Sequence, residues 1–131
     1  MQTYANIFDQ LPEQRDKESF TDLLREPGLL IERIVSYGQA SPPDFWYDQF
    51  WDEWVVVLRG YALMEFQNPD GTRVLQPGDH CWLPAGLKHR IVRTDAGGPT
   101  IWLAVHRGRG VDLSPSDTGS DARGAQGVVE I

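Results

Sequence analysis

Apolar residues at helical spacing occur in only one place, close to the beginning of the chain. Phe20, Leu23 and Leu24 share one face at this spacing, and Pro27–Gly28 then interrupts the run. Proline and glycine in this order are typical of the end of a helix. The pattern therefore predicts one short helix over residues 17–26.

From residue 29 onward the apolar residues form short runs that are typical of β-strands. The runs are rich in β-branched and aromatic residues, and Gly-, Pro- and Asp-Gly-containing turns separate them. The expected strands cover residues 29–36, 45–58, 61–66, 73–75, 80–83, 90–93 and 100–106. Many short strands at this spacing predict an all-β sandwich or barrel. The expected organisation is an N-terminal arm with the helix (1–28), a barrel (29–106) and an extended or mobile tail (107–131).

Length, charge and cysteine content narrow the class of protein. A chain of 131 residues suits a single domain, and a net charge of −7 disfavours nucleic acid and anionic membranes as partners. The single cysteine, Cys81, cannot form an internal disulfide, and the chain has neither a run of 18 apolar residues nor a signal-peptide pattern at its start. We therefore expect a cytoplasmic protein with no membrane contact.

A group of glycine, proline and histidine residues in the second half of the chain has a recognisable spacing. Gly78 is followed after five residues by Pro84, then after one residue by Gly86, and after two more by His89. This spacing resembles the second sequence motif of the cupin superfamily, which ends three residues later in Asn. Arg93 occupies that last position here.

The first cupin motif is matched in its second half. Glu53, six residues and Gly60 reproduce its ending, and the two motifs occur in the expected order. The chain is also similar to short bacterial cupins that carry Trp-Tyr-Asp-Gln ahead of an Asp-Glu-Trp strand and a later Ala-Val-His. The resemblance implies a cupin-type double-stranded β-helix, a jelly-roll barrel with its functional pocket at the mouth.

The resemblance also implies a metal site. Metal-binding cupins use His-x-His and Glu of the first motif with His of the second, so Glu53 and His89 are the implied ligands of a divalent Fe, Ni, Mn or Zn ion. The His-x-His pair is missing here. Strand alternation points Gln49 and Tyr47 inward with Glu53, whereas a β-bulge would bring Asp48 inward instead.

Donor chemistry leaves the presence of metal open. A Gln carbonyl is a weak ligand, while a carboxylate from Asp48 would be a better one. Glu53 has a second interpretation as a buried acid paired with His89, Arg90 or Arg93. His106, at the end of a strand, is either a ligand or proton shuttle of the same pocket, or a histidine of the core or rim.

Two functions fit these observations. In the first, a metal-dependent oxygenase, isomerase or lyase acts on a small polar substrate, with His106 or Tyr47 as general acid or base. In the second, a non-catalytic cupin with a degenerate metal site binds a small molecule. Either protein is expected to form a homodimer through exposed strands and tryptophans.

Overall fold

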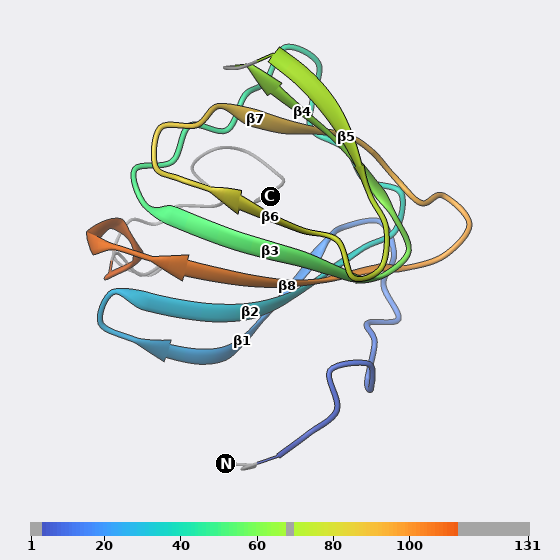
Figure 1. Ribbon diagram of the computed structural model, residues 1–131. Helices are drawn as coiled ribbons and strands as arrows, with labels where there is room; N and C mark the ends of the chain where they lie inside the picture. Colours follow the sequence, from blue (N-terminus) through green and yellow to red (C-terminus); the bar gives the residue numbers. More distant parts are fainter. Residues whose placement is uncertain (1–3, 68–69, 113–131) are drawn as a thin grey trace.

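The computed structural model describes residues 4–67 and 70–112, which form eight β-strands in two antiparallel sheets (Figure 1). The strands and one short 3-10 helix are β1 (Ser19–Glu26), β2 (Leu29–Ser36), β3 (Asp52–Arg59), β4 (Ala62–Gln67), β5 (Asp70–Leu75), β6 (His80–Leu83), β7 (His89–Thr94), β8 (Thr100–Arg107) and η1 (Arg109–Asp112). The larger sheet has the order β1-β2-β8-β3-β6, and the smaller one β5-β4-β7. The predicted all-β class is confirmed.

The predicted helix over 17–26 is wrong, because these residues form strand β1. β1 pairs with β2 in an antiparallel hairpin whose turn contains Gly28 at a φ of 75°. A helix of this length is marginal in water, whereas the edge of β2 offers a complete ladder of hydrogen bonds. Leu23 and Leu24, which suggested an apolar helix face, are both about half exposed. The N-terminal arm thus contributes a strand to the larger sheet.

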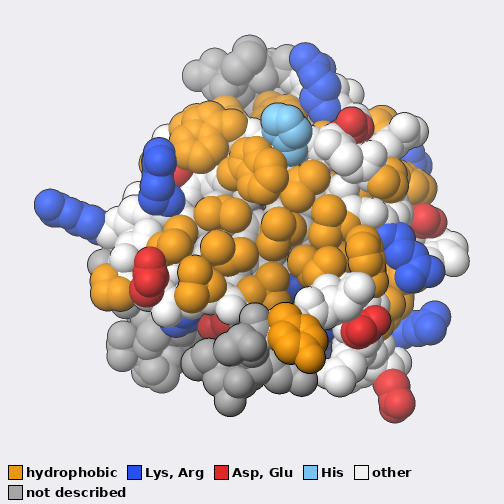
Figure 2. Space-filling view, turned by 60° about the horizontal axis from the view of Figure 1, so that its bottom comes forward, with side chains coloured by type: hydrophobic (Ala, Val, Ile, Leu, Met, Phe, Trp, Pro, Cys, Tyr) orange, Lys and Arg blue, Asp and Glu red, His pale blue; other side chains and the backbone are white. Residues whose placement is uncertain are grey.

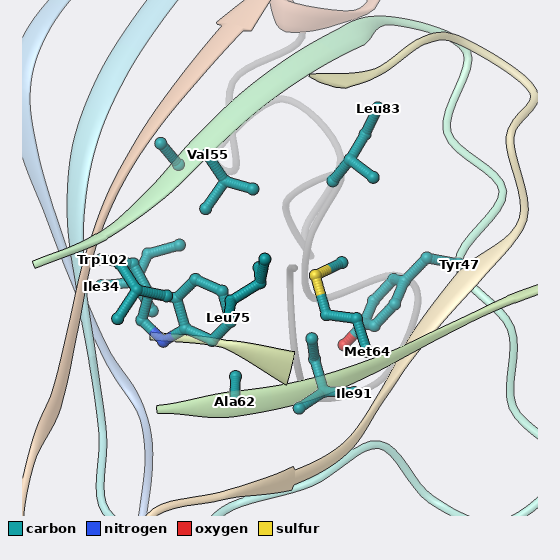
Figure 3. Packing of buried hydrophobic residues seen from close by; sticks show 11 residues of the cluster. Ile34, Tyr47, Val55, Ala62, Met64, Leu75, Leu83, Ile91 and Trp102 are labelled. Atoms are coloured by element: carbon teal, nitrogen blue, oxygen red, sulfur yellow. The ribbon is translucent and has the colours of Figure 1, made fainter. Parts of the chain in front are cut away.

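The hydrophobic core fills the space between the two sheets (Figure 3). In β3 the side chains alternate, so that Glu53, Val55 and Val57 point inward and are buried. Trp102, on the neighbouring β8, is the largest fully buried side chain. The core thus confirms the barrel interior that alternation along the strands predicts.

Gly60, the glycine that closes the first motif, lies where β3 ends and the chain turns toward β4. Its φ is +78°, and a Cβ atom there would lie 2.6 Å from Thr100 Oγ1 and 2.7 Å from the Pro99 carbonyl oxygen. Both the backbone conformation and this close approach require glycine.

The described residues contain no helix with the length and apolar character needed to cross a membrane. Of the tail expected over 107–131, β8 includes Arg107 and η1 covers Arg109–Asp112. The remainder of that expectation, from residue 113, lies outside the described residues.

Candidate functional site

Five buried side chains form a hydrogen-bonded group inside the barrel, where β3 begins and β8 ends (left in Figure 1). This inner polar cluster consists of Glu32, Gln49, Trp51, Glu53 and His106, none of which is more than 4% exposed. The strands β2, β3 and β8 are hydrogen-bonded neighbours, which brings Glu32, Glu53 and His106 together. Gln49 and Trp51 come from the segment that leads into β3.

His106 is held between a donor and an acceptor. The indole Nε1–H of Trp51 donates to His106 Nδ1 at 2.9 Å, and His106 Nε2 lies 2.9 Å from Glu32 Oε2. An indole N–H can only donate, so Nδ1 carries a lone pair and the proton resides on Nε2, which donates to Glu32. This arrangement holds a neutral imidazole in a single tautomer. Protonation of Nδ1 would break the hydrogen bond from Trp51.

Glu53 is fully buried at the centre of the cluster. Its Oε1 accepts a hydrogen bond from Gln49 Nε2 at 3.1 Å, and its Oε2 lies 3.9 Å from His106 Nε2. Oε2 has no hydrogen-bond partner among the described residues. Burial raises the pKa of Glu53 from 4.5 to about 7, opposed by His106 and the Gln49 hydrogen bond and reinforced by Glu32. A carboxyl group with this pKa exchanges a proton readily near neutral pH.

A third buried carboxyl group, that of Glu18 just before β1, lies next to the end of β2. Glu18 accepts a hydrogen bond from the Ser36 hydroxyl, and Ser36 Oγ in turn accepts one from the Trp102 indole N–H at 3.2 Å. Burial raises the pKa of Glu18 to about 7, and Glu32 adds to the rise while the Ser36 hydrogen bond opposes it. The described part of the barrel interior is therefore acidic, since Glu18, Glu32 and Glu53 are all buried there.

His89 and Tyr47 lie on the side of the barrel formed by β7. Tyr47 forms an isolated antiparallel bridge with His89, and their rings stack with centroids 5.4 Å apart. The Tyr47 ring extends into the hydrophobic core (Figure 3). His89 Nδ1 lies 3.1 Å from the Leu87 carbonyl oxygen, which can only accept, so Nδ1 carries the proton and Nε2 the lone pair. Metal-bound histidines commonly have this tautomer.

Gln49 and Asp48 point to opposite sides. Gln49 is buried, and its backbone carbonyl accepts the Gly86 N–H at 2.8 Å, which joins the two motif segments. Asp48 is exposed and takes no part in the cluster. Of the arginines considered as partners of Glu53, Arg90 pairs instead with Glu65 at 3.1 Å and Arg93 is exposed.

The donor set does not fit a divalent metal as it is arranged. No group of three or more His, Cys, Asp or Glu side chains among residues 4–67 and 70–112 could hold a metal ion. Glu53 and His89 are the two candidates, while both ring nitrogens of His106 are engaged by Trp51 and Glu32. Gln49 directs its amide nitrogen, a donor, toward Glu53.

Glu32 and Trp51 were not among the predicted site residues. Glu32 shares its strand parity with Leu30 and Ile34, which are apolar and point inward. An acidic residue at a core position of a strand is the signal that could have identified it, because buried charges require partners. For Trp51 the sequence offered no comparable signal beyond its position two residues before Glu53.

The described residues also line an open groove of about 650 Å³ between β5 and β6, the edge strands of the two sheets. Its wall includes Phe66, Arg73, Val74, His80, Trp82 and Leu87. None of the predicted site residues contributes to it.

Comparison with solved structures identifies the fold. The chain is similar to a protein from Ralstonia eutropha JMP134 provisionally named a mannose-6-phosphate isomerase, with 48% identity and a TM-score of 0.77 over 81% of this chain and 98% of that one. A cupin superfamily protein from Desulfitobacterium hafniense DCB-2 shares 19% identity, with a TM-score of 0.61 over 74% of this chain and 83% of the other. The cupin domain of Schizosaccharomyces pombe Cnp3 shares 14% identity, with a TM-score of 0.59 over 69% and 60% of the two chains.

The chain belongs to the cupin superfamily. It matches no protein-family model and no curated protein. The resemblance in the two motifs is thereby confirmed, as is the jelly-roll barrel that it implied. Of the residues at the positions of the missing His-x-His, Gln49 donates a hydrogen bond to Glu53 and Tyr47 packs in the core.

Proposed function

We propose that this cupin is an enzyme that binds a small polar molecule at the inner polar cluster and moves a proton with Glu53, in an isomerase- or lyase-type reaction. The observation that carries the proposal is the state of Glu53, whose buried Oε2 has no hydrogen-bond partner among the described residues. Burial raises the pKa of this carboxyl group to about 7. A general base is most effective when its pKa lies close to the working pH.

The proton balance of an aldose–ketose isomerisation fits a single carboxylate. Glu53 takes the proton from the hydroxyl-bearing carbon next to the carbonyl, the C–H electron pair forms a C=C bond, and the C=O π pair moves onto the carbonyl oxygen. The neighbouring hydroxyl proton moves to that oxygen, and the Glu53 carboxyl group returns its proton to the former carbonyl carbon as the new C=O bond forms. No oxidant or reductant is consumed.

His106 and Glu32 are positioning residues in this proposal. The Nε2–H of His106 is committed to Glu32 at 2.9 Å and lies 3.9 Å from Glu53 Oε2. The Glu32 carboxylate raises the pKa of Glu53, so this pair supports the protonated state that returns the proton. Tyr47 was a second candidate acid or base, and its ring in the core favours a packing role.

The proposed substrate class is a neutral polyhydroxy carbonyl compound. The relative from Ralstonia eutropha is named for a sugar phosphate. Arg33 is a buried cation of the described residues, and its guanidinium donates to the carbonyl oxygens of Ile7, Asp9 and Gln10. A phosphate group binds best to cations or clustered N–H donors, whereas the buried carboxyl groups Glu32 and Glu53 would repel it. An unphosphorylated sugar avoids that repulsion.

Proton exchange into substrate tests this proposal. The protein would be incubated in D₂O with mannose, fructose and their 6-phosphates, and deuterium at the carbons next to the carbonyl followed by NMR. We expect exchange with a neutral sugar, a loss of at least about 1,000-fold in Glu53→Gln, and unchanged exchange in Asp48→Asn. Exchange that survives in Glu53→Gln would contradict the role of Glu53. Ligand-induced thermal stabilisation without exchange would favour the non-catalytic binder.

A metal-dependent reaction is the second candidate, and the His89 tautomer favours it. With Nδ1 donating to Leu87, Nε2 carries the lone pair that a metal requires. Elemental analysis of untagged protein, before and after His89→Ala, separates the two candidates. Metal near one equivalent that disappears in the variant would support the metal enzyme. Exchange activity that persists after chelation, with no stoichiometric metal, would support the proton-transfer mechanism.

A further inference from the structure

The groove between the edge strands β5 and β6 has no part in the function proposed for Glu53. Its volume of about 650 Å³ lies in the range of small-molecule sites. The turn residues Gly78 and Asp79, which join the two strands, belong to its lining. None of the described residues that line it belongs to the inner polar cluster. The groove is therefore a separate candidate site.

Most of the side chains that reach the groove from the barrel interior are apolar. Leu75 belongs to the hydrophobic core cluster, and Phe66, Cys81 and Leu87 are partly buried and pack against that cluster. Cys81 is paired with Val55, which is fully buried and points inward, so the Cys81 side chain points inward as well. Walls of this kind favour a ligand with an apolar body, because its burial removes hydrocarbon surface from water.

Arg73 adds a permanent positive charge to these walls. It is paired with Met64, which is fully buried, so Arg73 leaves β5 on the inner side of the smaller sheet. Its Nη1 donates to the Thr72 carbonyl oxygen at 2.8 Å and lies 3.7 Å from the position of a Cβ atom on Gly71. The guanidinium thus extends over Gly71, where no side chain obstructs it. The Thr72 hydrogen bond uses one of its five N–H donors.

The groups around Arg73 leave its charge available. The Asp79 carboxylate is committed to the turn, where its Oδ2 accepts the Gln76 N–H at 2.8 Å. On the other side of the groove, burial raises the pKa of the Cys81 thiol, Glu53 adds to the rise, and Arg73 opposes it. The Arg73 charge therefore acts across the groove. A thiol with a raised pKa stays uncharged at neutral pH, so Cys81 does not neutralise this charge.

The outer side of the larger sheet provides a contrast. Figure 2, which turns the bottom of Figure 1 forward, shows hydrophobic side chains gathered there in a nearly continuous patch. Leu24, on this side, is 46% exposed. In the groove, by comparison, apolar side chains surround one guanidinium in a concave space. A concave, mostly apolar site with a few placed polar groups is typical of small-molecule recognition.

We propose that the groove binds a monocarboxylic acid with an apolar body, such as a medium-chain fatty acid, with its carboxylate on Arg73. A guanidinium fork and a carboxylate match in a bidentate pair. A monoanion is favoured over a phosphate dianion, because one cation holds it against a net protein charge of −7. The hydrocarbon chain then lies along Phe66, Leu75 and Leu87. This site is independent of the reaction proposed for Glu53.

Calorimetric titration of the full chain with octanoate, octanamide, hexanoate and octyl phosphate tests this selectivity. We expect octanoate to bind at least about tenfold more tightly than octanamide, which has the same length but no charge. Hexanoate should bind about tenfold more weakly than octanoate, because it lacks two methylene groups. Octyl phosphate should bind more weakly than octanoate.

Arg73→Gln should weaken octanoate binding at least about tenfold and leave octanamide binding unchanged. Arg93→Gln is the matched control, because it removes the same charge from an exposed position on β7 of the same sheet. It should change octanoate binding less than about twofold. Arg73 is exposed as well, so both variants should fold, which circular dichroism checks.

Cys81, the only cysteine of the chain, reports whether the ligand lies in the groove. Octanoate at ten times its dissociation constant should slow the alkylation of Cys81 by iodoacetamide about tenfold, as followed by mass spectrometry. The same octanoate concentration should protect Cys81 less than about twofold in Arg73→Gln. Equal binding of octanoate and octanamide, tighter binding of octyl phosphate, an octanoate affinity that Arg73→Gln leaves unchanged, or unprotected Cys81 would each overturn the proposal.

Discussion

Two tryptophan–histidine pairs lie on opposite faces of the larger sheet and use the same hydrogen bond. Inside the barrel, Trp51 Nε1–H donates to His106 Nδ1 at 2.9 Å; outside it, Trp54 Nε1–H donates to His80 Nδ1 at 3.3 Å. The inner imidazole is 1% exposed and has Glu32 on its other nitrogen, whereas His80 is exposed. Water can replace any partner of the outer pair but none of the inner one. The comparison shows that burial, rather than the type of contact, turns a Trp–His pair into a fixed proton donor.

The largest expected effect concerns the buried acids around the inner pair. The folded-state pKa of Glu53 is raised to about 7, so its contribution to stability is complete below its unfolded pKa near 4.5 and is lost as pH rises through 7. Between pH 5 and 8 the free energy of unfolding should fall by about 2 to 3 kcal/mol for this carboxyl group. Glu53→Gln should remove that fall in urea titrations at a fixed protein concentration.

Glu18 provides a check on whether the pH dependence of stability belongs to Glu53. Its pKa is raised to about 7 as well, so Glu53→Gln should leave the part of the pH dependence that belongs to Glu18. Asp48→Asn, at an exposed carboxylate, should leave the whole slope unchanged. A Glu53→Gln variant with the slope of the wild type would mean that Glu53 remains ionised in the folded protein.

Removing the indole N–H from each pair compares the two directly. Trp51→Phe leaves His106 Nδ1 buried without its donor, and we expect a loss of about 2 kcal/mol in the free energy of unfolding. Trp54→Phe should cost less than about 0.5 kcal/mol, because water replaces the donor at His80. Equal losses in urea titrations of the two variants would contradict the role of burial.

A substitution at Gly110 tests the packing that holds Trp51 in place. A Cβ atom at Gly110, in η1, would lie 2.6 Å from Trp51 Cε3 and 2.7 Å from Phe50 Cε2. Gly110→Ala should therefore destabilise the protein by about 1 kcal/mol through overpacking. Gly97→Ala is the matched control, because its Cβ would meet only Asp95 Oδ1 at 3.4 Å. A shift in the fluorescence of buried tryptophan should accompany Gly110→Ala alone.

The smallest effect is expected at Asp52, the outward neighbour of Glu53. The Ala85 N–H and Arg107 lower the pKa of Asp52, so its contribution is present above pH 3.8 and is lost as pH falls through the lower folded value. Asp52→Asn should thus lower the melting temperature slightly at pH 7, and its effect should become smaller as the pH falls below 3.8. The contributions of the adjacent residues Asp52 and Glu53 to stability would then depend on pH with opposite sign.

Short apolar runs rich in β-branched and aromatic residues predicted most of the barrel, because turn residues separate these runs along the chain. The bounds of β2 and β6 agree with the predicted strands, and the motif glycines mark turns. The helix prediction failed at β1 because its residues from Thr21 to Glu26 are exposed on both faces, so no alternation reveals the strand. Residues 19–26 form a strand because they pair with β2, and the local pattern of apolar residues carries no information about this pairing.

The candidate site could be predicted only where a motif marks it. Glu53 and His89 follow from motif spacing, and His106 was found as a histidine at the end of a strand. The partners of His106 come from 55 and 74 residues away along the chain. Such contacts depend on which strands become neighbours, and the order β2-β8-β3 is a property of the whole sheet.

Strand β8 carries a constraint on how this chain can change. It is paired along its length with β2 on one side and β3 on the other, and its consecutive residues Val105 and His106 face outward and inward. Inserting or deleting one residue before them would exchange the two faces, exposing the imidazole and burying the valine at its place. Substitutions can accumulate on either face of β8 independently. Changes in the length of β8 itself should not be tolerated, and insertions should be confined to the loops that precede and follow this strand.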